Sequence, residues 1–70
     1  MGKIKGYIAR DAFMGELCLY SEKPYRNTEG LGIWKMGIGG NIHLPKEMFP
    51  DLKWEDEPRM VEVTITALID

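Results

Sequence analysis

The last eleven residues of the chain carry its clearest pattern of hydrophobic and polar positions. Apolar and polar residues alternate there in the order Val61, Glu62, Val63, Thr64, Ile65 and Thr66. A period of two, built mostly from β-branched residues, predicts a β-strand with one buried face. The next three residues, Ala67, Leu68 and Ile69, are apolar without alternation, so we expect this end of the chain to need cover.

Two further strand-like runs, 4–11 and 16–21, flank the short loop 12–15 and predict a β-hairpin. Gly15 suits the left-handed backbone that such a loop requires. Pairing Asp11 with Glu16 gives a register of Tyr7 with Tyr20, Ile8 with Leu19, Ala9 with Cys18 and Arg10 with Leu17. Both faces are then partly apolar, so we expect either a sheet that curls into a barrel or a second face that meets another subunit.

The middle of the chain is typical of a loop followed by a second hairpin. Residues 23–30 are polar and contain a proline and a closing glycine, which predicts a loop. Residues 31–36 and 41–44 are short strand patterns on either side of the glycine-rich turn 37–40. Residues 46–49 lie between two prolines, and this spacing predicts a single helical turn.

These elements predict one all-β domain that spans residues 1–70. We expect a five-stranded antiparallel meander, arranged as a small, partly closed barrel of the SH3 or OB type with one short helical turn near 46–49. An α+β fold would need a longer helix than the sequence offers. Four apolar residues, Met48, Phe49, Leu52 and Trp54, are expected to plug an open end of the barrel.

The length and the cysteine count limit how such a domain is stabilised. A chain of 70 residues buries only about 60% of its unfolded surface, so its core is small. Cys18 is the only cysteine and His43 the only histidine, which leaves no disulfide and no zinc cluster. We therefore expect a soluble, cytoplasmic domain without metal, cofactor or membrane span, which gains stability as a homodimer.

Charge is divided unevenly along the chain. Residues 1–46 carry a net charge of +3 and residues 47–70 a net charge of −5, within a total of −2. This division favours an asymmetric partner, or copies that meet through opposite faces, unless folding back of the strands mixes the charges on the surface.

Several segments also support a resemblance. They are 6–11 (GYIARD), 19–24 (LYSEKP) and 44–58 (LPKEMFPDLKWEDEP), followed by the strand residues Val61, Glu62 and Val63. With these segments the chain resembles a group of short hypothetical proteins of gut anaerobic bacteria and their phages. It differs in the first hairpin turn, where apolar residues 12–14 replace a polar Asp-Gly turn. The resemblance implies a bacterial or phage origin and carries no activity, ligand or catalytic residue.

Three features suggest chemistry, and each has a simpler structural explanation. The glycines of 37–40 suit a phosphate-binding loop, but no helix and no Gly-Lys-Ser/Thr follows them. Cys18 and His43 would form a nucleophilic pair only if folding placed them together beside an activating charge. The acidic run 55–57 lacks the spacing of a calcium loop. We therefore expect no catalytic site and no metal site.

One surface combines basic and aromatic residues in a way that suits binding. Its members are Lys23, Tyr25, Arg26, Trp34 and Lys35. Aromatic rings stack on unpaired bases while basic side chains neutralise phosphates, so weak binding of single-stranded nucleic acid is the alternative function. A sequence pI of about 5.3 makes nucleic acid an unfavourable partner. We favour a protein-interaction module with an unknown protein partner, self-associating through Leu68 and Ile69.

Overall fold

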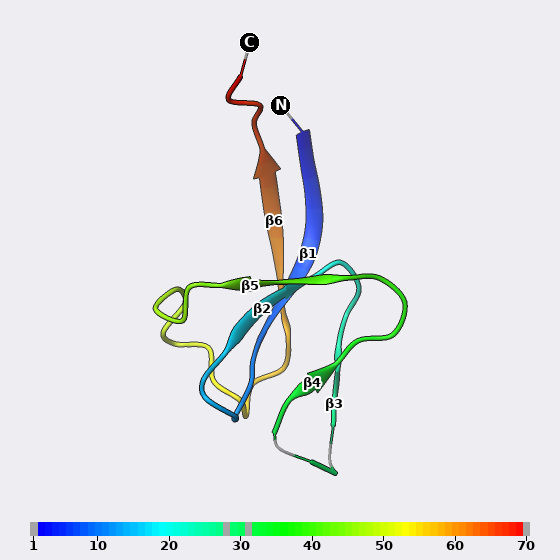
Figure 1. Ribbon diagram of the computed structural model, residues 1–70, viewed down its shortest axis with the longest axis vertical. Coiled ribbons are helices and arrows are strands. Elements are labelled where there is room, and N and C mark those ends of the chain that lie inside the picture. The colour runs from blue at the N-terminus through cyan, green and yellow to red at the C-terminus, as the bar shows by residue number, and fades with distance from the viewer. Residues whose placement is uncertain (1, 28, 31, 70) are drawn as a thin grey trace.

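β1 and β6 are the two longest strands of the protein, and they pair side by side (Figure 1). The computed structural model describes residues 2–27, 29–30 and 32–69. Six strands lie within these residues: β1 (Gly2–Arg10), β2 (Leu17–Tyr20), β3 (Tyr25–Arg26), β4 (Trp34–Lys35), β5 (Asn41–Leu44) and β6 (Arg59–Ile65). The predictions for Met1, Thr28, Leu31 and Asp70 fall outside the described residues.

The first hairpin has the predicted register. Its pairs are Tyr7 with Tyr20, Ile8 with Leu19, Ala9 with Cys18 and Arg10 with Leu17. The amide of Asp11 donates to the carbonyl of Glu16 at 2.8 Å, which closes the loop. Gly15 has a φ of 64°, as predicted, and Met14 is also left-handed with a φ of 60°. Local periodicity and turn chemistry were therefore sufficient to predict this hairpin.

The strands do not form the predicted five-stranded meander. They form two antiparallel sheets, one of order β5-β2-β1-β6 and one that pairs β3 with β4. The all-β class is confirmed, but the described residues form no closed barrel. Closure would require β5 to pair with β6, and these strands are instead the two opposite edges of the larger sheet.

The second predicted hairpin is wrong. Tyr25–Arg26, inside the predicted loop, pairs with Trp34–Lys35, while Asn41–Leu44 pairs with β2. The residues on either side of 37–40 thus belong to different sheets. The physical reason is burial of the Trp34 ring, which packs against Ala9, Cys18 and Tyr20 of the larger sheet.

The predicted helical turn at 46–49 is wrong as well. The segment 45–58 is a loop of successive turns, in which the amide of Met48 donates to the carbonyl of Pro45 at 3.1 Å and that of Leu52 to Phe49 at 2.9 Å. Phe49 has a φ of 52°, and a left-handed residue interrupts a right-handed helix. Nowhere in the described part of the chain is there a helix with the length and hydropathy to cross a membrane.

The core lies on both sides of the larger sheet. On one side, which we call the Leu52 side, Leu52 of the 45–58 loop packs on Ile8 and Leu17, and all three are at most 2% exposed. On the other, the Trp34 side, Trp34 packs on Ala9, Cys18 and Tyr20, with Trp54 at its margin. Of the predicted plug, Leu52 and Trp54 cover the sheet, whereas Met48 and Phe49 remain 43% and 36% exposed.

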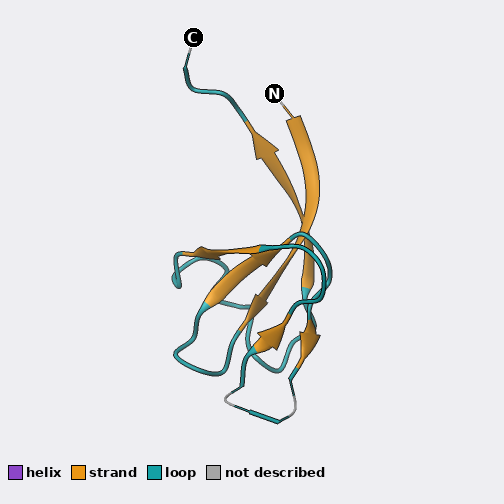
Figure 2. Ribbon diagram, turned by 45° about the vertical axis from the view of Figure 1, so that its right-hand side comes forward, coloured by secondary structure: helices purple, strands orange, loops and turns teal. Residues whose placement is uncertain are grey.

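Beyond this core, the sheet narrows to two strands. Gly2–Gly6 of β1 pairs with Val61–Ile65 of β6, and we call this two-stranded extension the arm. The arm projects from the rest of the protein, and both termini lie at its tip (Figures 1 and 2). The arm lengthens the molecule, which measures 46 Å along its longest axis and 17 Å along its shortest. On the Leu52 side, the sheet face of the arm is therefore largely uncovered.

Candidate functional site

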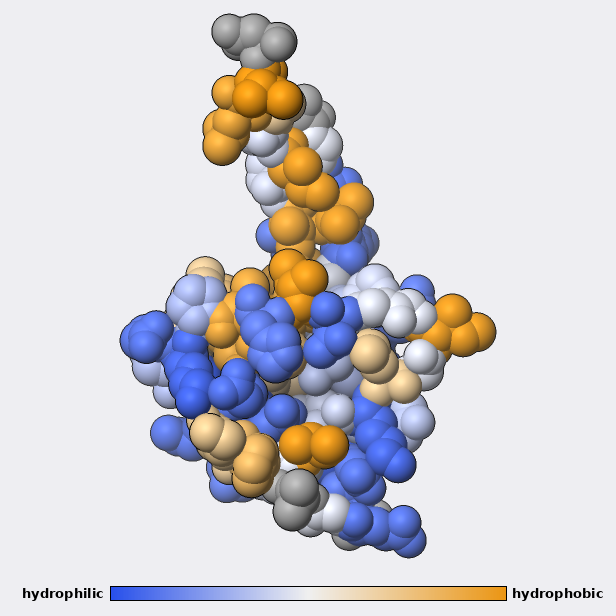
Figure 3. Space-filling model, in the orientation of Figure 1, coloured by the Kyte–Doolittle hydropathy of each residue, from blue (hydrophilic) through white to orange (hydrophobic). Residues whose placement is uncertain are grey.

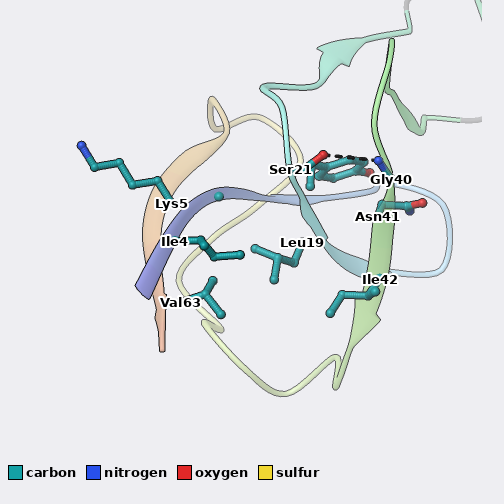
Figure 4. A pocket seen from close by; sticks show the side chains of 10 residues that line it. Ile4, Lys5, Leu19, Ser21, Gly40, Asn41, Ile42 and Val63 are labelled. Carbon is teal, nitrogen blue, oxygen red and sulfur yellow. Dashed lines mark hydrogen bonds between the residues drawn. The ribbon is translucent and has the colours of Figure 1, made fainter. Parts of the chain in front are cut away.

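An apolar hollow lies at the base of the arm. It has a volume of about 300 Å³. Figure 4 shows its walls, Ile4, Leu19, Ile42 and Val63, which come from four strands and point toward a common centre. Four aliphatic side chains around an open space make a site for an apolar group rather than for an ion or a polar metabolite.

Strand pairing explains why these side chains meet. Ile4 is opposite Val63 on β6, and Leu19 is opposite Ile42 on β5. Residues that pair across antiparallel strands share a face, so all four lie on the Leu52 side with Ile8 and Leu17. Gly6 also lines the hollow, and its lack of a side chain leaves room there. A Cβ at this position would approach the Leu19 Cδ1 atom to 3.0 Å and the Tyr20 carbonyl to 3.1 Å.

The hollow is a continuation of the core that the 45–58 loop leaves uncovered. Leu52 seals the part of the face around Ile8 and Leu17. Ile4 and Ile42, farther along the same face, are 55% and 58% exposed. Apolar side chains continue along the arm toward its tip (Figure 3). The result is a contiguous apolar strip rather than scattered surface residues, and such strips mark interaction sites.

The surface predicted from basic and aromatic residues is divided by the fold. Trp34 is only 7% exposed, and its Nε1 donates to the Arg10 carbonyl at 2.9 Å, so its ring belongs to the core. The Arg26 guanidinium lies between two indoles, 4.6 Å from the Trp34 ring centre and 4.7 Å from that of Trp54. Lys23, Tyr25 and Lys35 are exposed. The Trp34 ring, which would stack on a nucleobase, is therefore already packed within the protein. So is Arg26, one of the three basic residues of this surface.

Folding does bring Cys18 and His43 together, the pair that the sequence left as a conditional nucleophile and base. The Cys18 Sγ lies 3.7 Å from His43 Nδ1, and the same nitrogen lies 3.3 Å from Glu16 Oε1. A relay that activates a thiol uses both ring nitrogens, one toward the nucleophile and one toward the carboxylate. Burial raises the pKa of the Cys18 thiol, which keeps it protonated. This cluster therefore links β2 to β5 and does not promote deprotonation of the Cys18 thiol.

Glu16 is the centre of that polar link, and its titration gives a prediction. Its Oε2 lies 3.2 Å from Lys46 Nζ, and this bond, helped by His43, lowers the pKa of the carboxyl. A lowered pKa in the folded state stabilises the protein at pH values above the unfolded pKa, and this contribution is lost as the pH falls through the folded pKa. We expect Glu16→Gln to reduce the free energy of unfolding slightly at pH 7 and to make no difference well below pH ~4. Urea denaturation at both pH values measures this, and an equal loss at both would contradict the ion-pair explanation.

The remaining predicted site residues lie at the end of the chain. Leu68 and Ile69 follow β6 and are 92% and 88% exposed, so they do not fold back onto the core. Within the described residues, histidine, cysteine and acidic side chains form no group of three or more that is suited to a metal ion. The prediction missed the hollow itself, although the alternation of Ile4 with Ile8 on β1 and of Leu17 with Leu19 on β2 indicated one shared apolar face.

Comparison with known proteins adds no relative on which to base an assignment. The chain matches no protein-family model, no curated protein and no solved structure. Its function is therefore inferred from the hollow, the arm and their exposed strand edges.

Proposed function

We propose that this chain is a non-catalytic β-domain that binds protein and associates with itself. The observation that supports this proposal is the apolar strip that runs from the hollow along the arm. A partner's apolar side chains would complete the face that the 45–58 loop covers only in part. Binding would then stabilise a domain whose own core contains few fully buried side chains.

Self-association is favoured because the exposed apolar residues lie beside open backbone. Leu68 and Ile69 extend from the tip of the arm, and Ile4 and Ile65 are each 55% exposed on the arm itself. A partner that pairs with the arm satisfies backbone groups and covers these side chains in one step. We also propose a two-fold dimer, the commonest closed form for identical chains. A cytoplasmic location and a bacterial or phage origin are proposed on the sequence features alone.

Sedimentation velocity at micromolar concentration tests this function. We expect the native chain to sediment at about twice the 8.0 kDa mass of one chain. Replacing Leu68 with Glu and Ile69 with Lys should shift it to the mass of one chain, because charged side chains would have to be buried in the dimer. The matched control is Met14→Glu with Ile38→Lys, which adds the same charges at positions 64% and 91% exposed in other loops. A native chain that stays monomeric, or a control that dissociates equally, would contradict the proposal.

A further inference from the structure

The outer edge of β6 carries a row of backbone groups without a strand partner. β6 is the last strand of the larger sheet, and no described strand pairs with its outer side. The hydrogen bond from the Asp11 amide to the Glu16 carbonyl fixes which residues of β1 face β2. Because hydrogen-bonded positions alternate along antiparallel strands, the outward-facing backbone groups of β6 belong to Met60, Glu62 and Thr64.

The arm has a second open edge, and the two edges differ in how they are protected. β2 ends opposite Tyr7, so the backbone groups of Lys3 and Lys5 on β1 also lack a strand partner on that side. Lysines at an edge discourage pairing with another chain. β6 contains no lysine and no proline, and its pairing with β1 runs without a bulge from Arg59 to Ile65. The less protected edge is therefore that of β6, whose one charged residue within the arm is Glu62.

We propose that two copies of this chain pair through β6, antiparallel and with the two-fold axis at Val63, so that two four-stranded sheets become one of eight strands. This inference rests on the proposed self-association and names its surface. Sheet continuation places the Leu52 side of one copy level with the Leu52 side of the other, because residues opposite each other share a face. The pairs Ile4–Val63 of both copies then form one apolar row across four strands.

Charge and hydrogen-bonding capacity select this register over those with the axis at Glu62 or at Val61. An axis at Glu62 would overlap the strands most fully, but it sets Glu62 directly against its own copy, and like charges in that position destabilise a sheet. An axis at Val61 sets Thr64 against Pro58, which has no N–H to donate. With the axis at Val63, Glu62 faces Thr64 of the second copy, and both have outward-facing backbone groups.

The same register explains two exposed apolar positions. The chain after β6 continues along the second copy, so that Leu68 comes diagonally beside Met60 of that copy on the Trp34 side of the sheet. Met60 is 58% exposed and Leu68 is 92% exposed in the single chain. Leu68 of each copy would thus be covered by Met60 of the other, whereas both side chains are exposed in the single chain.

Disulfide cross-linking tests the register on the full chain. Val63→Cys brings the new thiol against its own copy at a non-hydrogen-bonded position, where Cα atoms lie about 4.5 Å apart, within the range of a disulfide. Under mild oxidation this variant should form a covalent dimer. The controls are Lys3→Cys, on the protected edge, and the native chain, whose Cys18 is only 3% exposed; neither should cross-link.

A backbone variant tests the edge without new chemistry. Thr64→Pro removes an N–H that faces outward and leaves the bonds to β1 in place, so the fold should persist with unchanged circular dichroism. It should weaken dimerisation about tenfold or more, since two-fold symmetry removes two hydrogen bonds at once. A dimer that cross-links through Lys3→Cys and not Val63→Cys, or that ignores Thr64→Pro, would overturn the inference while the proposed self-association stands. A native monomer would overturn both.

Discussion

Replacing Arg10 with methionine should lower the free energy of unfolding by about 3–6 kcal/mol, because its two partly buried hydrogen bonds are worth about 1.5–3 kcal/mol each. The Arg10 guanidinium donates to five backbone carbonyls at 2.9–3.0 Å: those of Gly15, Lys46, Met48, Phe49 and Leu52. Four of them belong to the 45–58 loop. One side chain of β1 therefore holds the loop that carries Leu52 over the Leu52 side of the sheet.

The comparison variants separate this role from charge alone. Arg10→Lys keeps the charge, but an ammonium group has three donors at one point and does not span the loop, so most of the loss should remain. Arg59→Met removes an arginine whose side chain is bound to Asp51 at 3.0 Å and is 39% exposed, and it should cost at most ~1 kcal/mol. Guanidinium denaturation followed by circular dichroism measures all three. Full stability in Arg10→Lys would show that charge, and not the five-donor fork, positions the loop.

Local patterns predicted the parts of the fold that local forces determine. The first hairpin depends on alternation and on a turn that accepts left-handed residues, and its pairs Ile8–Leu19 and Arg10–Leu17 are as predicted. β6 likewise follows from alternation, since the alternating residues 61–66 predicted a strand and the strand runs from Arg59 to Ile65. In both cases the side chains that decide the structure lie within a few positions of one another.

The pairing of distant segments was not predictable in this way. Trp34 lies in a short strand whose neighbours in sequence suggest a hairpin with 41–44, but it pairs with Arg26, inside a segment that is polar enough to be a loop. The gain comes from burying an indole against Cys18 and Tyr20, which are far away in sequence. Nothing in the local pattern records such a contact. The loop carbonyls that bind Arg10 are equally invisible, because a carbonyl has no sequence signature.

The candidate site shows the same division. Leu68 and Ile69 were expected to need cover, as candidates for self-association, and they are 92% and 88% exposed in the single chain. The hollow required knowing that β5 joins β2 and that β6 joins β1, because only then do Ile4 and Ile42 lie on one face. The candidate surface of Trp34 and Arg26 is divided by the fold, because basic residues near aromatic ones in sequence also stack on them within a core.

Trp34→Ala should be the other strongly destabilising change, with an expected cost of about 3–5 kcal/mol, the range for truncating a buried tryptophan. The ring is 7% exposed, and its Nε1 donates to the Arg10 carbonyl. It also meets Trp54 edge to face at 5.4 Å between ring centres and carries the Arg26 guanidinium on its face. A domain of this size has a total stability of about 4–10 kcal/mol, so this loss removes about a third of it or more.

Two further variants assign that loss to its causes. Trp34→Phe keeps most of the apolar area but removes the Nε1 donor, leaving the partly buried Arg10 carbonyl without its partner, and should cost about 1–3 kcal/mol. Trp54→Ala removes the half-buried partner of the ring pair and should cost less than Trp34→Ala, because more of that indole is already in water. Urea denaturation followed by circular dichroism, which does not depend on the fluorescence of the removed rings, gives the order of the three. If Trp54→Ala proved the costliest, Trp54 would be the ring that anchors the small sheet. The prediction that the buried Trp34 ring contributes most would then be wrong.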